Sequence, residues 1–299
     1  MIDADTRNTC AVRRLLIIHN PTAGRRPRRY LDRVIAALHA RGTSVEQVET
    51  THPGHGEAIA RTVRPDRFDA VVAAGGDGTI NEIVNGMARD ALPLAIVPVG
   101  TGNVLANEIG LPDQAGALAA VIAAGRRRRV HLGEVDGRLF TMMAGIGFDA
   151  HVVAGIDLVL KRRVGKLAYA VETLRRMVKW GLLPYRVDID GVTYDCASLI
   201  AAKGHFYGGR FVAAPEASLD RPSIDIVLFE RSGRLAALRY ALALASGRLA
   251  RLPDVRIVRG REIVIAGHDG EPVQADGDTI ARLPAAIRLA EATIDLIVP

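Results

Sequence analysis

The sequence predicts an α/β protein with an N-terminal open parallel sheet and a mostly antiparallel β-sandwich second domain. Up to about Gly125, short β-branched runs alternate with longer amphipathic stretches, a pattern typical of parallel strands joined by crossover helices. After the run Arg126–Arg129 the segments become short alternating strands, joined by the Asp-Gly pairs at 136–137 and 190–191. A length of 299 residues is ample for two such domains.

The expected elements of the first region follow in order along the chain. Strands are expected at Leu15–Ile18, Val45–Val48, Ala70–Ala73 and Leu94–Val97. Helices are expected at Pro27–Ala40, at Glu57–Val63 and from about Ile80 or Asn81 onward. The first of these helices carries apolar residues at helical spacing, namely Leu31, Val34, Ile35 and Leu38.

In the second region, Asp-Gly between alternating strands is a strong hairpin signal, because both turn positions need positive φ. One stretch, Gly155–Trp180, breaks the alternation and carries apolar residues on one helical face with basic residues on the others. Packing in the core is one interpretation of this helix. Contact with a membrane surface, through its basic cluster Lys161–Arg163, is the other.

Composition excludes several classes of protein. Apolar residues make up 49% and charged residues 24%, so the chain is neither disordered nor fibrous. Two cysteines, Cys10 and Cys196, provide neither a disulfide framework nor a four-thiolate metal site, which favours a reducing compartment. The first ten residues lack the order of a signal peptide, and no apolar run reaches the roughly 20 residues of a membrane span. We therefore expect a soluble protein that at most lies on a membrane.

The charge balance is 39 basic against 33 acidic residues, and all but four of the basic residues are arginine. Because arginine binds phosphate groups through a planar fork, binding of an anionic partner is one interpretation of the arginine clusters. A solvated surface of an arginine-rich chain is the other, and for any single cluster it is favoured. Aromatic residues are only 4%, and no basic segment is interleaved with stacking rings, so we expect no nucleic-acid partner.

Three turns of small and hydroxyl-bearing residues follow three of the expected strands. They are Asn20–Gly24, Gly75–Thr79 (GGDGT) and Gly100–Asn103 (GTGN). The carboxyl ends of parallel strands meet at one edge of a sheet, so these turns should converge on one site. Closely spaced glycines before a helix let the backbone approach a phosphate, and the free N–H groups at the helix start favour an anion.

Asp77 lies in the middle of this expected anion site. A carboxylate repels phosphate unless a cation lies between them, so Asp77 predicts a divalent metal ion together with the nucleotide. The glycine-rich signatures of the commonest nucleotide-binding proteins are absent: no Gly-Lys is followed by Ser or Thr, and no G-x-G-x-x-G follows a strand. His52 and His55 have no third ligand at metal spacing nearby and are expected to be loop residues.

In these motifs the sequence resembles the diacylglycerol kinase catalytic family of lipid kinases, which includes sphingosine and ceramide kinases and bacterial relatives. The matching segments span nearly the whole chain in the family's order: Asn20–Gly24, Thr50 with Gly54, GGDGTINEIVNG at 75–86, PVGTGN at 98–103, GIGFD at 145–149 and QADGD at 274–278. NAD kinases share the GGDGT turn, but the continuation NEIVNG and the PVGTGN turn resemble the lipid kinases.

The resemblance implies a domain at 1–130 that binds ATP and is joined by a final segment at about 283–299. It implies a β-sandwich at 131–282 that binds the lipid and closes a cleft over the lipid head. The nucleotide contacts that it implies are Asn20, Pro21, Thr22, Gly24, Thr50, Gly75, Gly76, Asp77, Gly78, Thr79, Asn81 and Thr101.

The late motif supplies the expected catalytic groups. His268–Glu271 spells the family's Asp-Gly-Glu, but its surroundings do not match, whereas Asp276-Gly277-Asp278 follows Pro272, Val273 and Gln274 as in the family. Asp276 is therefore expected to accept or orient the proton of the lipid hydroxyl, with Asp278 as its partner and Asp77 as a further catalytic group. Asp278 replaces the family's Glu, so its carboxylate is one methylene shorter. An alternative interpretation of Asp276-Gly277 is a hairpin turn like the other two.

A second departure concerns metal. Bacterial lipid kinases have a Leu-Asp-Asp-Gly-like stretch whose second Asp helps to hold a structural magnesium, and here the stretch is Leu219–Ser223, with Arg221 at that position. Asp220 is the remaining candidate ligand. Because a guanidinium cannot coordinate a cation, we expect this site to be absent or rebuilt, with Arg221 supplying the positive charge.

Together these features predict an ATP- and magnesium-dependent kinase that phosphorylates a hydroxyl of a diacylglycerol-like lipid. Within enzymes the alternatives are a kinase for a sphingoid base or another lipid and an NAD kinase. Because Asp278 and Arg221 depart from the family's pattern, a regulator that binds nucleotide or lipid with weak turnover is an alternative from another class. The expected location is cytoplasmic, at the inner face of the membrane, where the lipid substrate lies. The oligomeric state is not predicted.

Overall fold

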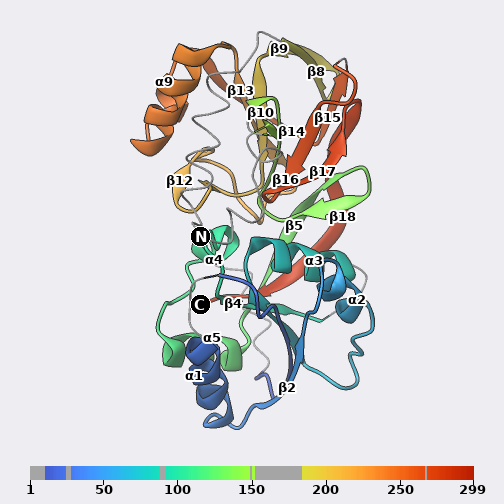
Figure 1. The fold of residues 1–299 in the computed structure, drawn as a ribbon, viewed down its shortest axis with the longest axis vertical. Coiled ribbons are helices and arrows are strands. Elements are labelled where there is room, and N and C mark those ends of the chain that lie inside the picture. Colours follow the sequence, from blue (N-terminus) through green and yellow to red (C-terminus); the bar gives the residue numbers. More distant parts are fainter. Residues whose placement is uncertain (1–10, 25–27, 88–91, 149, 152–183, 267) are drawn as a thin grey trace, which may run out of the picture. The chain divides into compact units, whose positions relative to one another are not determined.

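The computed structural model of the chain describes residues 11–24, 28–87, 92–148, 150–151, 184–266 and 268–299 (Figure 1). The chain divides into two compact units. Unit 1 comprises Met1–Val130 and Ala292–Pro299, and unit 2 comprises His131–Glu291. An N-terminal parallel sheet in unit 1 and antiparallel sheets in unit 2 confirm the predicted α/β fold class.

Unit 1 is built on parallel strands in the order β2-β1-β3-β4. The end of the last strand of the chain, β18, pairs with β4 through Leu296 and Leu94, also in parallel. The four predicted strands are all present, as β1 (Arg14–His19), β2 (Ser44–Glu49), β3 (Ala70–Gly75) and β4 (Leu94–Pro98).

Helices cover both faces of this sheet. They are α1 (Arg28–His39), α2 (His55–Arg61), α3 (Asp77–Met87), α4 (Val104–Glu108) and α5 (Ala115–Ala124). In Figure 1, α1 and α5 lie together on one side of the strands, while α2 and α3 lie on the other. Every residue of β3 and β4 is buried, as expected for central strands covered on both faces.

Unit 2 is a sandwich of antiparallel strands. One sheet has the order β14-β13-β10-β7-β16-β17, and in the other β18, β15, β8 and β9 are neighbours, with β5 and β6 attached. The strands are β5 (Arg127–Val135), β6 (Arg138–Phe140), β7 (Met143–Ile146), β8 (Tyr185–Ile189), β9 (Val192–Cys196), β10 (Ser198–Ala202), β13 (Ile224–Phe229), β14 (Val255–Gly260), β15 (Glu262–Ala266), β16 (Pro272–Ala275), β17 (Asp278–Arg282) and β18 (Ala285–Ile297). A separate small hairpin is formed by β11 (Phe206–Tyr207) and β12 (Phe211–Val212).

The core of unit 2 lies between the two sheets. Its buried members include Ile146, Leu199 and Ile226 from the first sheet and Val187 and Ile263 from the second. Alternate residues of these strands point inward, which is why the sequence shows period-two patterning.

Both predicted Asp-Gly hairpins are present. Asp136 and Gly137 join β5 to β6 with φ of 48° and 82°, and Asp190 and Gly191 join β8 to β9 with φ of 49° and 85°. Positive φ at both central residues is the type I′ geometry that matches the twist of the flanking strands.

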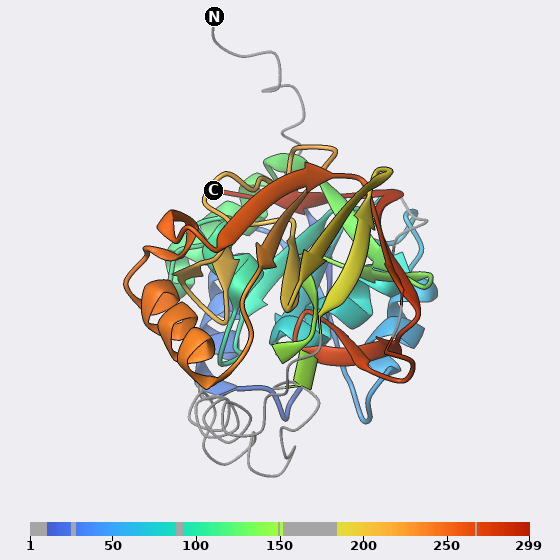
Figure 2. The same cartoon turned by 90° about the horizontal axis from the view of Figure 1, so that it is seen from above.

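Unit 2 also contains the helix α9 (Arg234–Ala245) and the short 3₁₀ helix η1 (Leu249–Arg251). Figure 2 shows α9 to one side of the strands of unit 2 rather than between the sheets. No helix in the described ranges is long and apolar enough to cross a membrane. The helix predicted at 155–180 lies wholly outside the described residues.

Cys196 lies in the core of unit 2 and is 2% exposed, whereas Cys10 falls outside the described residues. Burial raises the pKa of the Cys196 thiol to about 12. The folded thiol therefore stays protonated at pH values where an unfolded thiol, with a pKa near 9.0, ionises.

A Cys10→Ser variant is expected to react with Ellman's reagent at pH 8 only after addition of denaturant. The folded state keeps the proton of Cys196, so this group's contribution to stability is full below pH 9 and is lost as the pH rises toward 12. Rapid stoichiometric labelling of the native variant at pH 8 would contradict the buried position.

Candidate functional site

The three glycine-containing turns lie at the carboxyl edge of the unit 1 sheet, after β1, β3 and β4, and they contact one another. The Asn20 side chain donates from Nδ2 to Oγ1 of Thr79 at 3.0 Å, which joins the first turn to the second. A Cβ built on Gly76 would lie 3.3 Å from Cα of Gly100, so the second turn packs on the third. The predicted convergence of the three turns is confirmed.

Close backbone approach explains the glycines at these positions. A Cβ at Gly24 would lie 1.5 Å from the Val99 carbonyl oxygen, and one at Gly100 would lie 2.4 Å from Cα of Gly76. A Cβ at Gly75 would meet the Thr79 side chain at 2.4 Å. Of these four glycines only Gly24 has a positive φ, of 78°. The glycines of the second and third turns therefore serve close packing rather than a left-handed backbone.

Helix α3 begins at Asp77, three or four residues earlier than predicted. The prediction failed because Gly78 was assigned to the turn, whereas it lies in the first turn of the helix. The first intrahelical bond is from the Ile80 N–H to the Gly76 carbonyl, at 3.0 Å. The N–H groups of residues 77–79 thus have no partner within the helix, and they lie where its dipole is positive. This arrangement is suited to an anion.

The polar side chains of the first turn organise the loop itself. Oδ1 of Asn20 accepts from the backbone N–H of Thr22 at 3.0 Å and from its hydroxyl at 2.9 Å. The backbone N–H of Asn20 donates to the Ala74 carbonyl at 3.0 Å. Pro21 and Thr22 are exposed. The amide of Asn20 therefore holds the first turn against the second and leaves the Thr22 side chain at the surface.

Asp77 joins the second turn to the third. Its Oδ1 accepts from the N–H of Val104, the first residue of α4, at 2.7 Å. Its Oδ2 lies 2.7 Å from where a Cβ on Gly102 would be, which explains that glycine. Thr101, which precedes Gly102, is exposed. Asp77 thus has a structural partner in the third turn, and the metal ion expected beside it stays a prediction.

The segment NEIVNG holds α3 against α2. The Glu82 carboxylate accepts from the N–H groups of Gly54 at 2.8 Å and Gly56 at 3.0 Å, which satisfies the N-terminus of α2. A Cβ at Gly86 would lie 2.5 Å from the Glu57 carbonyl oxygen, so the helices approach closely there. The role of Glu82 was not predicted from the sequence, although it is the one charged residue of NEIVNG.

The remaining predicted nucleotide residues are near these turns. Thr50 is 8% exposed and follows β2, with its N–H donating to the His19 carbonyl at 2.8 Å. Asn81, in α3, is 9% exposed, and its backbone and side-chain oxygens both accept from Asn85 Nδ2. Both residues are in unit 1 with the three turns.

In unit 2, Asp276 and Gly277 form the two-residue turn between β16 and β17, with φ of 48° and 88°. Their geometry matches that of the Asp190-Gly191 turn, so the hairpin interpretation is correct for the backbone. The side chain of Asp276, however, is held more extensively than that of Asp190.

Four donors reach the Asp276 carboxylate. The Thr141 backbone N–H and hydroxyl donate to Oδ2 at 2.7 and 2.9 Å, and the Met142 and Met143 N–H groups donate to Oδ1 at 2.9 and 3.1 Å. A carboxylate has about four lone-pair sites, so these donors match its capacity. The carboxylate is fixed in position, as a group that orients a substrate must be.

The other acidic residues of this region have different surroundings. Asp278 begins β17 and is exposed, while Oε1 of Gln274 accepts from the Gly277 N–H at 3.1 Å. Glu271, in the rejected His268–Glu271 segment, pairs with the His151 ring, and its charge contributes to the raised pKa of Tyr185, which burial chiefly causes. Glu271 therefore has a local structural role.

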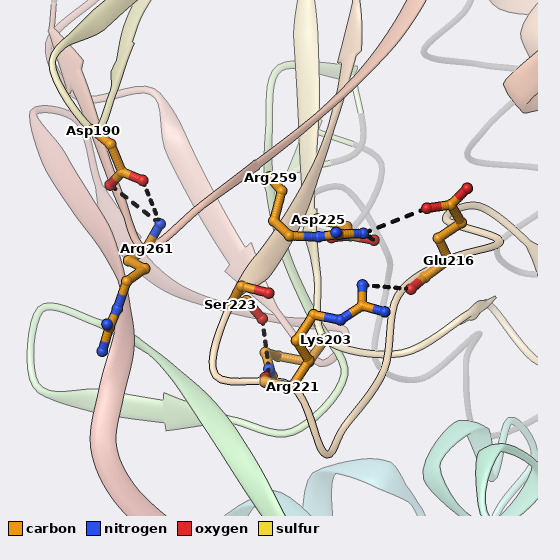
Figure 3. A network of polar contacts seen from close by, with 8 residues as sticks. All are labelled: Asp190, Lys203, Glu216, Arg221, Ser223, Asp225, Arg259 and Arg261. Atoms are coloured by element: carbon orange, nitrogen blue, oxygen red, sulfur yellow. Dashed lines mark hydrogen bonds and ion pairs between the residues drawn. The ribbon is translucent and has the colours of Figure 1, made fainter. Parts of the chain in front are cut away.

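The residues at the expected structural magnesium site do not fit a metal ion. The Arg221 guanidinium donates to the Glu216 carbonyl at 3.0 Å, and Asp220 is exposed (Figure 3). The carbonyl oxygens of Arg221 and Ser223 each accept from Nζ of Lys203 at 2.7 Å. The expectation that Arg221 supplies the charge is wrong, because the ammonium at these carbonyls belongs to Lys203. Lys203 was not predicted as a site residue, because it lies in no recognisable motif.

Other metal sites find no support among the described residues, where no group of three or more His, Cys, Asp or Glu side chains is placed to hold an ion. His52 and His55 stack on each other at 4.9 Å between ring centroids, in the loop before and at the start of α2. His52 lies in a loop as expected, whereas the expectation is wrong for His55, which is the first residue of α2.

Comparison with known proteins assigns both halves of the chain. The family model of the diacylglycerol kinase catalytic domain matches residues 14–135, and that of the YegS C-terminal NAD kinase beta sandwich-like domain matches residues 142–298. Curated proteins named diacylglycerol kinase from Staphylococcus aureus strains MRSA252 and JH9 are each 28% identical over 293 residues, covering 96% of this chain and 93% of the relative.

Solved structures from Bacillus anthracis str. Sterne share the fold. One has a TM-score of 0.83 at 23% identity and covers 99% of both chains. Another, described as a diacylglycerol kinase, has a TM-score of 0.78 at 22% identity and covers 96% of this chain and 98% of its own.

The packing of the turns predicts that Gly100→Ala lowers the free energy of unfolding of unit 1 by about 1–3 kcal/mol, because the added methyl overlaps Gly76. Gly116→Ala in α5 is the matched control, since a Cβ there meets nothing within 4 Å. That change is expected to stabilise the protein by about 0.5–1 kcal/mol. Urea unfolding measures both, and equal effects would contradict the packing argument.

Proposed function

Because the chain belongs to the diacylglycerol kinase catalytic family, we propose that it transfers the γ-phosphoryl group of ATP to a hydroxyl of a diacylglycerol-like lipid. The observation that carries this proposal is that the segment matching the catalytic domain contains all three packed turns of unit 1. These turns offer backbone N–H groups at a helix N-terminus, which suit the phosphates of a nucleotide.

For the nucleotide, we assign the phosphates to the start of α3 at Gly76–Thr79, flanked by the turns at Asn20–Gly24 and Gly100–Asn103. Thr22 and Thr101 are exposed beside these turns. The Thr101 hydroxyl is available to the nucleotide, whereas the Thr22 hydroxyl would have to leave Asn20 Oδ1 first. Magnesium bound with ATP supplies charge neutralisation on the transferring group. Asp77, at the start of α3, is the carboxylate of this region that would face that ion.

For the lipid hydroxyl, we assign Asp276 as the group that orients it and accepts its proton. Thr141 Oγ1 is the one hydroxyl among the four donors on this carboxylate, and a hydroxyl can rotate away while the three backbone N–H groups cannot. A lipid hydroxyl can then take its place on Oδ2. Asp278, at the end of the same turn, is assigned as the supporting acid, one methylene shorter than the family's Glu.

The alternatives differ in the acceptor. A sphingoid base or another lipid uses the same chemistry. NAD phosphorylation is kept as a second candidate because the model that matches unit 2 is named after an NAD kinase-like β-sandwich. A regulator that binds nucleotide or lipid without turnover is the candidate from another class.

We further propose that the protein works at the cytoplasmic face of a membrane and that α9 contacts anionic lipid. Leu235, Leu238 and Leu242 lie along one stripe of this helix and are 84%, 46% and 62% exposed. The opposite stripe, with Ala237, Tyr240 and Ala243, is buried. An exposed leucine stripe on a helix favours an apolar or interfacial environment.

The charges around α9 support an anionic partner. Residues 231–251 contain five arginines and no Asp or Glu. Arg231 and Arg239 both pair with Asp254, whereas Arg234, Arg248 and Arg251 are exposed. Each arginine at an anionic membrane surface contributes about 1 kcal/mol of attraction.

The activity is tested by incubating the protein with labelled ATP and magnesium and with each of three acceptors: diacylglycerol, a sphingoid base and NAD. We expect label in diacylglycerol. Asp276→Asn is expected to lower the rate by about 10²–10⁴-fold with ATP binding retained, because a positioned acid-base group contributes this much.

Asp190→Asn is the matched control, since Asp190 occupies the same type of turn and its carboxylate accepts from the N–H groups of Arg261 and Glu262. It should leave the rate within a few fold of the unchanged protein. Label in NAD alone would favour an NAD kinase. ATP binding without label in any acceptor would favour a regulator without turnover. Equal rates for Asp276→Asn and Asp190→Asn would contradict a catalytic role of Asp276.

The membrane contact is tested with vesicles containing phosphatidylglycerol. Replacing Leu235, Leu238 and Leu242 together by Gln keeps the helix propensity but removes the apolar stripe, so binding should weaken at least about tenfold. Val192→Thr with Val264→Thr is the control, because these valines are 53% and 43% exposed on strands. Sedimentation that shows equal binding by both variants would contradict the role of α9.

A further inference from the structure

Lys203 is the most deeply buried cation in the described part of the chain. Its side chain is 0% exposed, and it follows directly after β10. Nζ donates to the carbonyl oxygens of Arg221 and Ser223, both at 2.7 Å, in the loop before β13 (Figure 3). Two converging carbonyl oxygens are the type of ligand that a hard divalent cation uses.

The surroundings exclude a divalent cation at these carbonyls. An ammonium already occupies both oxygens, and a second positive charge beside it would be repelled. Position 221, where the related stretch has a carboxylate, holds an arginine whose guanidinium points to the Glu216 carbonyl. The buried carboxylate nearby, Asp225, is paired with Arg259 through Nε at 2.8 Å.

We propose that the Lys203 side chain replaces the structural divalent cation of related lipid kinases by bridging the carbonyl groups of Arg221 and Ser223. The chain then orders this loop without a metal ion. The bridge is permanent, since the side chain is covalently attached and enclosed, whereas a bound ion exchanges with solvent.

The bridge holds in both protonation states of the amine. Burial lowers the pKa of Lys203 to about 8, although the negative charge of Asp225 opposes this shift. An ammonium has three N–H groups and a neutral amine has two, so either form can donate to both carbonyl oxygens. The contact therefore does not require a particular pH.

Lys203 also holds the segment that binds Asp276. Its backbone N–H donates to the Met142 carbonyl at 2.8 Å, and the Met142 N–H donates to the Asp276 carboxylate at 2.9 Å. Anchoring of the Lys203 side chain in the loop thus fixes one end of a chain of contacts that leads to Asp276.

The test measures thermal unfolding of the full chain without nucleotide or lipid, so its outcome does not depend on the kinase activity. The melting temperature of the unchanged protein should be the same in EDTA and in millimolar Mg²⁺ or Ca²⁺. Lys203→Met should lower the melting temperature of unit 2 by about 5 °C or more, because two carbonyl groups lose their donor.

Arg221→Ala is the control, since it keeps the backbone carbonyl that Lys203 bridges and removes only the guanidinium, which donates to the Glu216 carbonyl. It should change the melting temperature by less than half as much. The double variant Lys203→Met with Arg221→Asp restores a carboxylate and removes the ammonium, so its melting temperature should rise on addition of Mg²⁺.

Three results would overturn the proposal. The melting temperature of the unchanged protein could rise with Mg²⁺ or Ca²⁺, or Arg221→Ala could lower the melting temperature as much as Lys203→Met does. The third is a double variant whose melting temperature does not change with Mg²⁺. If Lys203→Met does not fold, hydrogen exchange on the unchanged protein decides. Protection of the Ser223 and Met142 amides should be identical in EDTA and in Mg²⁺, and a metal-dependent gain at either amide contradicts a metal-free loop.

Discussion

The close backbone contact between Gly76 and Gly100 is the constraint on which the candidate nucleotide site depends. With a Cβ at Gly100 only 2.4 Å from the Gly76 Cα, no side chain fits between the turns after β3 and β4. Gly24 brings the turn after β1 against Val99 in the same way. These contacts bring the start of α3 and the ends of three parallel strands together, and the polar bonds of Asn20 and Asp77 then hold the turns in register.

The two Asp-Gly turns at 190 and 276 show how one local structure serves different purposes. Both have the same backbone geometry, which the dipeptide dictates. At position 190 the carboxylate accepts from the N–H groups of Arg261 and Glu262, at the start of β15. At position 276 it accepts from four donors of the segment Thr141–Met143. The difference comes from residues more than 130 positions away, so the dipeptide alone does not distinguish them.

The sequence predicted strands, the hairpins and the convergence of the turns, because periodicity and turn residues act locally. It placed the start of α3 too late, since Gly78 was assigned to the turn. It recognised that Arg221 could not bind metal but attributed the charge to the wrong side chain. Lys203 lies 18 residues before Arg221, and only tertiary structure brings its Nζ to the carbonyl groups. The leucines of α9 were similarly hidden, because a run of apolar residues does not reveal which of them face outward.

The central claim is that this chain phosphorylates a lipid hydroxyl. The most direct measurement is to incubate the protein with ATP, magnesium and a total lipid extract, and to identify every new phosphorylated species by mass spectrometry. We expect a phosphorylated diacylglycerol whose formation depends on the protein and on ATP. A phosphorylated product that is not a lipid, or the absence of any product while ATP remains bound, would contradict it.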